Sequence, residues 1–169
     1  MLRLLAAASA AAAARGVSPS VALGNAAQPG VFMPVMGLGT GGYGNQRDVA
    51  KPECWNESDG CGATSYNATL AWLKTAFSAG ETLIRIDNAD SYDNLGSVGR
   101  AMQDSGVPRA NIFLTSKTGS PYPLGYDDTM SQFANVLKTQ MVSYVDLLLS
   151  ESAQTREGPR HLPCRQRAP

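Results

Sequence analysis

The sequence has few of the residues on which metal sites and disulfide-stapled folds depend. Its 169 residues include one histidine, His161, and three cysteines, Cys54, Cys61 and Cys164. None of these has the spacing of a metal-ligand cluster, so we expect no metal. Three cysteines are also too few for a disulfide scaffold. Cys54 and Cys61 could form a bridge in an oxidising compartment or remain free thiols.

Charge is scarce and balanced. Charged residues make up 17% of the chain, against roughly a quarter in an average protein. The 14 lysines and arginines match the 14 aspartates and glutamates. A net charge of zero favours neither a nucleic acid nor an acidic partner, and no apolar run approaches the ~20 residues that cross a bilayer. We therefore expect a globular chain with no nucleic-acid partner and no membrane span.

Acidic residues are absent before Asp48. The chain opens with MLRLLAAASAAAAARG, which has a basic start, an apolar run and small residues after it. This pattern is typical of a secretory signal, and arginine, serine and alanine without acids are equally typical of an organellar transit peptide. The alternative is a low-complexity tail with no targeting function, which would leave the chain in the cytoplasm. We therefore set residues 1–25 apart from the fold.

Apolar residues elsewhere alternate between two spacings. Short apolar runs predict strands, and apolar positions three or four residues apart predict helices. Asn94 is a candidate N-cap for the second helix, and Asp127 or Asp128 for the third. The expected order is a strand opening 31–44, a helix over 66–77, a strand over 82–87, a helix from 95 to Gly106, a strand over 111–117, a helix over 130–141 and a strand over 144–150. This alternation indicates βαβ units and a parallel sheet.

Three polar residues fall at matching places in that sheet. Asp87 and Lys117 end successive strands, and Tyr92 lies in the loop after the first of them. The carboxyl ends of parallel strands share one edge, where the active sites of α/β barrels lie. A lysine ammonium close to a phenol favours the phenolate, and Asp87 would hold Lys117. A tyrosine in this setting can protonate a carbonyl oxygen as a hydride reaches the carbon.

A glycine-rich stretch precedes these residues. GLGTGG, residues 37–42, matches the dinucleotide fingerprint G-x-G-x-x-G. That motif must open a helix whose N-terminus meets the pyrophosphate. The residues that follow, YGNQRDVAKPECW, have no helix pattern. The stretch is therefore not expected to form a Rossmann site.

Four segments together resemble the aldo-keto reductases. They are MPVMGLGTGG, RIDNADSYDNLGSVGRAM, VPRANIFLTSKTG and YVDLLLS, in the order and spacing of that family. The family motif of Asp, a small or hydroxyl residue, Ala, two residues, Tyr, one residue and Asn is matched by Asp87, Ala89, Tyr92 and Asn94. The resemblance, which covers residues 31–150, implies a (β/α)8 TIM barrel that reduces aldehydes or ketones with NADPH.

The resemblance also implies roles for single residues. Tyr92 would be the general acid, and Lys117 and Asp87 would tune it. The resemblance places Gly39, Thr40 and Gly41 near the nicotinamide of NADPH, and Asp87 near its ribose.

The sequence departs from the family pattern at two positions. Leu95 stands where many members have Glu, and Glu151 stands where the family usually has a His after its fourth strand. One branch of the family, which reduces carbon–carbon double bonds, carries Glu there, but the residues after Glu151 also lose the pattern. The alternative is that family-like sequence stops at Ser150. Residues 151–169, which include four arginines, would then form an unrelated disordered tail.

Size is a third departure, because about 120 family-like residues stand against the roughly 250 of a closed barrel. We therefore expect an incomplete (β/α)8 TIM barrel of about four parallel strands with helices and disordered termini. One hypothesis is an NADP-dependent oxidoreductase of a small carbonyl substrate, with little activity alone because the second half of its NADPH site is absent. The other is a non-catalytic half-barrel fragment or interaction protein. Unpaired strand edges would favour self-association.

Overall fold

A computed structural model describes residues 18–24, 30–41, 63–119 and 125–151. Three expectations lie wholly or mostly outside these residues. The targeting segment is expected over 1–25, of which only 18–24 are described, and the disordered tail over 151–169, of which only Glu151 is described. The third is a bridge between Cys54 and Cys61, neither of which is described. No helix in the described ranges is long and apolar enough to cross a membrane. Within the same ranges, no group of three or more His, Cys, Asp or Glu residues is arranged to hold a metal ion.

A four-stranded parallel sheet forms the centre of the fold. Its strands, in spatial order, are β3 (Gly37–Gly39), β4 (Ile84–Asp87), β5 (Ile112–Thr118) and β6 (Leu147–Ser150). Neighbours in sequence are neighbours in the sheet, and all three pairs are parallel. The predicted arrangement of four parallel strands is confirmed, and the carboxyl ends of all four share one edge.

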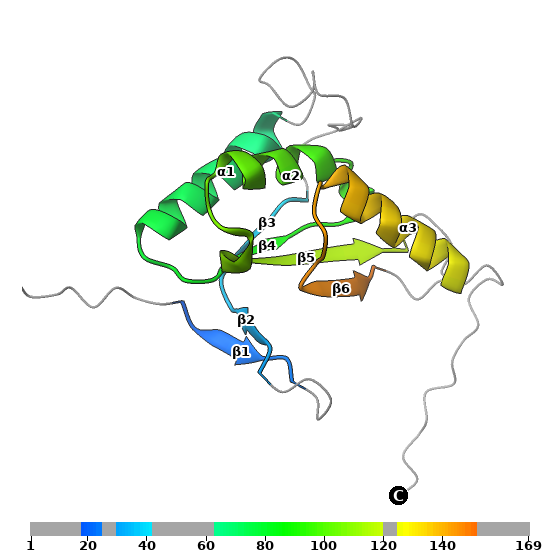
Figure 1. The fold of residues 1–169 in the computed structure, drawn as a ribbon, viewed down its shortest axis with the longest axis horizontal. Coiled ribbons are helices and arrows are strands. Elements are labelled where there is room, and N and C mark those ends of the chain that lie inside the picture. The colour runs from blue at the N-terminus through cyan, green and yellow to red at the C-terminus, as the bar shows by residue number, and fades with distance from the viewer. Residues whose placement is uncertain (1–17, 25–29, 42–62, 120–124, 152–169) are drawn as a thin grey trace, which may run out of the picture.

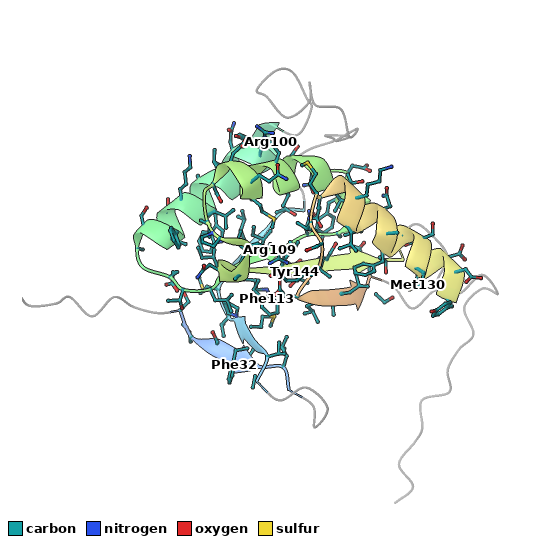
Figure 2. All side chains as sticks on the ribbon, viewed as in Figure 1. Phe32, Arg100, Arg109, Phe113, Met130 and Tyr144 are labelled. Carbon is teal, nitrogen blue, oxygen red and sulfur yellow. The ribbon has the colours of Figure 1, made fainter. Side chains whose placement is uncertain are left out.

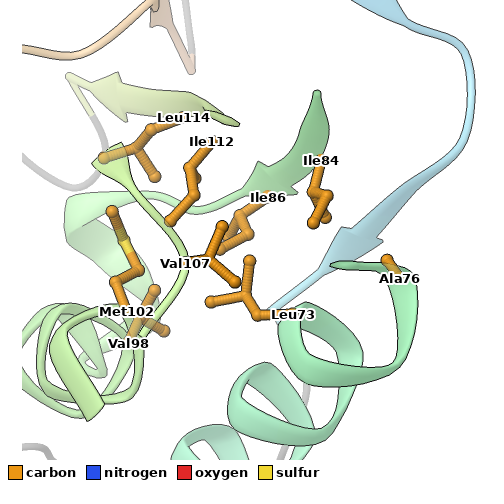
Figure 3. Close-up of a cluster of buried hydrophobic side chains, with 9 residues drawn as sticks. All are labelled: Leu73, Ala76, Ile84, Ile86, Val98, Met102, Val107, Ile112 and Leu114. Atoms are coloured by element: carbon orange, nitrogen blue, oxygen red, sulfur yellow. The ribbon is translucent and has the colours of Figure 1, made fainter. Parts of the chain in front are cut away.

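Three helices lie together on one side of this sheet (Figure 1). They are α1 (Ala63–Ser78), α2 (Leu95–Asp104) and α3 (Tyr126–Thr139). Between α1, α2 and the strands lies a cluster of buried apolar side chains, formed by Leu73, Ala76, Ile84, Ile86, Val98, Met102, Val107, Ile112 and Leu114 (Figure 3). Since alternate residues of a strand point to opposite faces, Arg85, Asp87, Thr115 and Lys117 lie on the face away from this core.

A small antiparallel hairpin precedes the sheet and lies on the side away from the three helices (Figure 1). Its strands are β1 (Ser20–Ala22) and β2 (Phe32–Pro34). The sequence pattern predicts one strand at the start of 31–44, whereas the structure has β2 and then β3. All of β1 is exposed and two of the three residues of β3 are glycines, so neither strand carries the apolar run that identifies the others.

α2 begins at Leu95 with Asn94 at its N-cap position, as predicted, but the capping contacts of the helices differ from those predicted. Asn94 precedes α2, but its side chain makes no cap hydrogen bond. α3 begins after Gly125, so Asp127 and Asp128 lie inside its first turn. Negative charge in a first turn is favourable beside the positive end of the helix dipole, and this explains why acids there resemble a cap in the sequence.

α3 buries less of its surface than the apolar spacing predicts. Its one fully buried residue is Val136, whereas Met130, on the predicted apolar face, is 49% exposed (Figure 2). Phe133 and Leu137 are half-buried. The helix therefore leaves part of its apolar face uncovered within the described residues.

Candidate active site

Three side chains from two strands and a turn meet at the carboxyl edge of the sheet. Asp87 ends β4, and Lys117 lies near the end of β5. Tyr92 ends a short 3₁₀ turn, η2 (Asp90–Tyr92), that follows β4. The strand register pairs Asp87 with Thr115, so Lys117 lies two residues further along β5 on the same face. The predicted trio therefore comes from two adjacent strands and the loop between them.

The Lys117 ammonium joins the other two side chains. Its Nζ donates hydrogen bonds to Asp87 Oδ1 at 2.5 Å, to Tyr92 OH at 3.0 Å and to the backbone oxygen of Asn88 at 3.1 Å. An ammonium has three hydrogens, and these three acceptors account for all of them. The geometry thus fixes the ammonium between a carboxylate and a phenol.

The surroundings of Lys117 keep it charged. Burial works against the ammonium, but the hydrogen bonds and the electrostatic attraction to Asp87 and Tyr92 outweigh it and raise the pKa of Lys117 above its ordinary value. The Lys117 side chain is only 16% exposed. A poorly hydrated positive charge therefore lies directly beside the Tyr92 hydroxyl.

The glycine-rich strand lets these side chains approach the backbone closely. A Cβ placed on Gly41 would lie 3.0 Å from the ring of Tyr92, and one on Gly37 would lie 2.9 Å from the Arg85 stem. At Gly39, which pairs with Asp87 in the register, an added Cβ would meet nothing within 4 Å. The stretch therefore makes room for Tyr92 and Arg85 and leaves open space beside Asp87.

Thr40 ties the ends of β3 and β4 together. It is fully buried, and its backbone N–H donates to the Asp87 backbone oxygen at 3.0 Å. Its hydroxyl lies 3.1 Å from that same oxygen and 2.9 Å from Asn88 Oδ1. The Asn94 amide in turn donates to the Thr40 backbone oxygen at 2.8 Å. Asn94, in the motif that carries Tyr92, thus stands at the N-cap position of α2 but uses its side chain to anchor the loop.

Glu151 stands at the position where the resemblance predicts a histidine. Its backbone N–H donates to the Thr118 oxygen at 2.8 Å, which extends the pairing with β5. Its Oε2 accepts a hydrogen bond from the Ser91 hydroxyl, one residue before Tyr92. The carboxylate therefore attaches the η2 turn to the end of β6. Leu95, the other departure from the family pattern, is buried at 4% exposure.

Arg85 is a site residue that the sequence analysis does not identify. Its Nη2 pairs with Asp87 Oδ2 at 2.9 Å, on the carboxylate oxygen that Lys117 leaves free. The signal that could have found it is strand alternation, because a residue two positions before Asp87 lies on the same face of β4.

Comparisons with known proteins identify the family of the chain. Residues 35–155 match the model of the aldo/keto reductase family. The chain is 33% identical over 134 residues to morphine 6-dehydrogenase of Pseudomonas putida, covering 79% of the chain and 36% of that protein. It is also 33% identical over 120 residues to an aldehyde reductase of Saccharomyces cerevisiae, covering 71% of the chain and 30% of that protein.

A solved structure shows the same fold. The aldo/keto reductase of Brucella melitensis superposes with a TM-score of 0.52 at 28% identity, covering 79% of this chain and 41% of that one. The chain thus spans less than half the length of these relatives. The matched residues include the four parallel strands and every side chain described at their carboxyl edge. The chain belongs to the aldo/keto reductase family, and its sheet is part of that family's α/β barrel.

Proposed function

We propose that the chain carries the proton-donating part of an NADPH-dependent reductase that converts an aldehyde or ketone into an alcohol. The observation that carries the proposal is the position of Lys117 Nζ, which hydrogen-bonds to both Asp87 Oδ1 and Tyr92 OH. The name of the yeast relative, an aldehyde reductase, supports the substrate class.

Each of the three side chains has one task in this reaction. NADPH, when bound, supplies the hydride. Tyr92 gives its phenolic proton to the carbonyl oxygen while the carbon receives the hydride. The Lys117 ammonium, 3.0 Å from the Tyr92 oxygen, stabilises the phenolate that remains. Asp87 holds the ammonium in place and keeps it charged.

We propose that the nicotinamide lies beside Gly39, Thr40, Gly41 and Asp87. The space beside Gly39 is open and is bordered by Asp87 on the neighbouring strand. Gly41 lies against the Tyr92 ring, so the phenol is close to the same space. Thr40 would act indirectly, by fixing the backbone between the two glycines. We propose that the adenosine phosphate and most of the pyrophosphate bind to later parts of the family barrel.

A hybrid barrel tests this function. Residues 35–150 would replace the matching segment of the Brucella melitensis aldo/keto reductase, and NADPH oxidation would be followed with a simple aldehyde. The hybrid should be active, and Tyr92→Phe should lower kcat by about 10²–10⁴, the usual contribution of acid–base catalysis, without weakening NADPH binding. The matched control is Tyr126→Phe on α3, where the side chain is 81% exposed. Equal rates in the Tyr92→Phe hybrid and the unsubstituted hybrid would exclude Tyr92 as the acid.

A further inference from the structure

Two cations share the carboxylate of Asp87. Lys117 Nζ binds Oδ1 at 2.5 Å, and Arg85 Nη2 binds Oδ2 at 2.9 Å. The side chains of Arg85, Asp87 and Lys117 are 20%, 26% and 16% exposed, so none of the three is freely hydrated. The pair of Lys117 and Asp87 takes part in the proposed reaction. The pair of Arg85 and Asp87 has no assigned role in it.

The fold holds Arg85 in place from two sides. Gly37 pairs with Arg85 in the register, and a Cβ there would lie 2.9–3.0 Å from the Cβ, Cγ and Cδ of the arginine. The Trp72 indole on α1 donates to the Arg85 backbone oxygen at 3.1 Å. The stem of Arg85 therefore lies closely against β3, and its backbone is tied to α1.

Burying part of the Arg85 guanidinium costs free energy, and a gain in stability alone does not explain its position. Its Nε is buried and makes no hydrogen bond to another described residue. A partly buried ion pair is weak evidence for stability, because desolvation of the charges offsets much of their attraction. An effect on the neighbouring charges explains its presence better than an effect on stability.

We propose that Arg85 is a positioning residue of this site, which acts through Asp87 by dividing its carboxylate between two cations. The inference rests on the proposed function. Because Oδ2 is held by Arg85, Asp87 neutralises Lys117 less completely than it would alone. The group of Arg85, Asp87 and Lys117 carries a net charge of +1 instead of zero. This excess positive charge favours the phenolate that Tyr92 becomes when it gives up its proton.

Three other acids lie near this edge, and one of them, Asp93, is exposed to solvent. Glu151 accepts from Ser91, and Asp90 accepts from the Asn135 amide at 3.4 Å. The groups that face Lys117 directly are Asp87 and Tyr92. A change at Arg85 should therefore reach Lys117 through Asp87.

The titration of Lys117 tests the proposal in the 169-residue chain without any need for turnover. The Lys117 side-chain signal would be followed by NMR as the pH rises, and assigned by its loss in Lys117→Met. Arg85→Gln, which keeps a hydrogen-bond donor but removes the charge, should move the midpoint to higher pH. Arg85→Lys should restore it toward the wild-type value. The matched control is Arg100→Met on α2, where the arginine is 41% exposed in a pair with Asp104.

An unchanged Lys117 midpoint in folded Arg85→Gln, or a shift of the same size in Arg100→Met, would overturn the proposal. If Arg85→Gln does not fold, Arg85→Met offers the same comparison with a stem of similar length. The readout is independent of catalysis. An inactive hybrid with the expected Lys117 shift would count against the proposed function alone, whereas an active hybrid without the shift would count against Arg85 alone.

Discussion

At the scale of single residues, the turn that carries Tyr92 is held by its neighbours. Asp90 bonds to Asn135 on α3, and Ser91 bonds to Glu151 at the end of β6. Tyr92 itself follows directly and bonds to Lys117. The position of the proposed acid therefore depends on contacts to two elements that lie far from it in sequence.

Asp90 should weaken the fold at neutral pH. Burial and the nearby charges of Asp93 and Glu151 raise its pKa, although the hydrogen bond from Asn135 acts in the opposite direction. A carboxyl whose pKa is raised in the folded state destabilises that state once it is ionised, and the penalty disappears as the pH falls below the unfolded pKa of 3.8. Asp90→Asn should therefore raise the urea midpoint at pH 7, with a gain that shrinks toward pH 4.

The matched control for Asp90 is Asp127→Asn in the exposed first turn of α3. It should give no gain, because a negative charge there is favourable to the helix. A lower urea midpoint for Asp90→Asn than for the wild type at pH 7 would contradict the assigned cause.

Ser91 and Glu151 should be coupled. Ser91→Ala removes the donor to Glu151 Oε2 and should lower the free energy of unfolding by about 1.5–3 kcal/mol, the range for a hydrogen bond to a charged group. In a double-mutant cycle with Glu151→Ala, the two losses should not add, since they break the same contact. Strictly additive losses would show that the two residues act separately.

The trio could be predicted from the sequence because strand ends in a parallel sheet have a fixed meeting place. Asp87 and Lys117 end adjacent strands, and the motif around Tyr92 supplies the loop. The sequence analysis does not predict the contact of Arg85 with Asp87 or the contact of Ser91 with Glu151. Sequence spacing does not determine which cation binds the second carboxylate oxygen of Asp87. It also does not determine the direction of the Glu151 side chain.

At the scale of secondary structure, α1, α2 and the strands form one packed unit. Leu73 on α1 is fully buried against the core that contains Ile86 and Val98 (Figure 3). The site lies on the opposite face of the same strands. The packing of α1 against β4 therefore helps to fix the backbone that carries Arg85 and Asp87.

Leu73→Ala should therefore be costly. Loss of a fully buried leucine typically lowers the free energy of unfolding by about 2–5 kcal/mol, through lost burial and the cavity that remains. Phe77→Ala, one turn further along α1, removes a larger side chain that is 44% exposed and should cost less. Chemical denaturation of the two variants measures both. A smaller loss in Leu73→Ala than in Phe77→Ala would contradict the described packing.

The strands and helices with a regular apolar pattern could be predicted, and those without one could not. β4 alternates, β5 opens with the apolar run Ile-Phe-Leu, and α1 and α2 have helical spacing. β3 is Gly-Leu-Gly, and its place in the sheet is decided by the side chains of Arg85 and Tyr92 that need room beside it. β1 is exposed throughout, so only its pairing with β2 defines it.

At the scale of the whole molecule, the described part of the sheet has two open edges. β3 pairs only with β4, and β6 pairs only with β5, within the described ranges. Open edges offer unpaired backbone groups to another chain. We therefore propose that the 169-residue chain self-associates.

Leu149 on β6 should contribute to this association, since it is 40% exposed on an edge strand. Leu149→Lys should raise the monomer fraction measured by sedimentation velocity, because charge on an edge opposes pairing between chains. Met130→Lys on α3, at 49% exposure away from the edges, is the matched control and should change it less. A monomeric wild-type chain would contradict the proposed self-association.

The central proposal is that this chain holds the proton-donating part of a reductase site, and that the groups that bind most of the cofactor belong to later parts of the family barrel. Positioning the nicotinamide over a carbonyl carbon can contribute about 7–11 kcal/mol to lowering the barrier, and the trio alone does not supply it. The most direct measurement is a fluorescence titration of NADPH with the purified 169-residue chain, combined with aldehyde turnover in the wild type and in Tyr92→Phe. We expect no micromolar binding and a rate equal to that of buffer in both. Micromolar binding with turnover that Tyr92→Phe abolishes would contradict the claim and show that a complete site assembles from this chain alone.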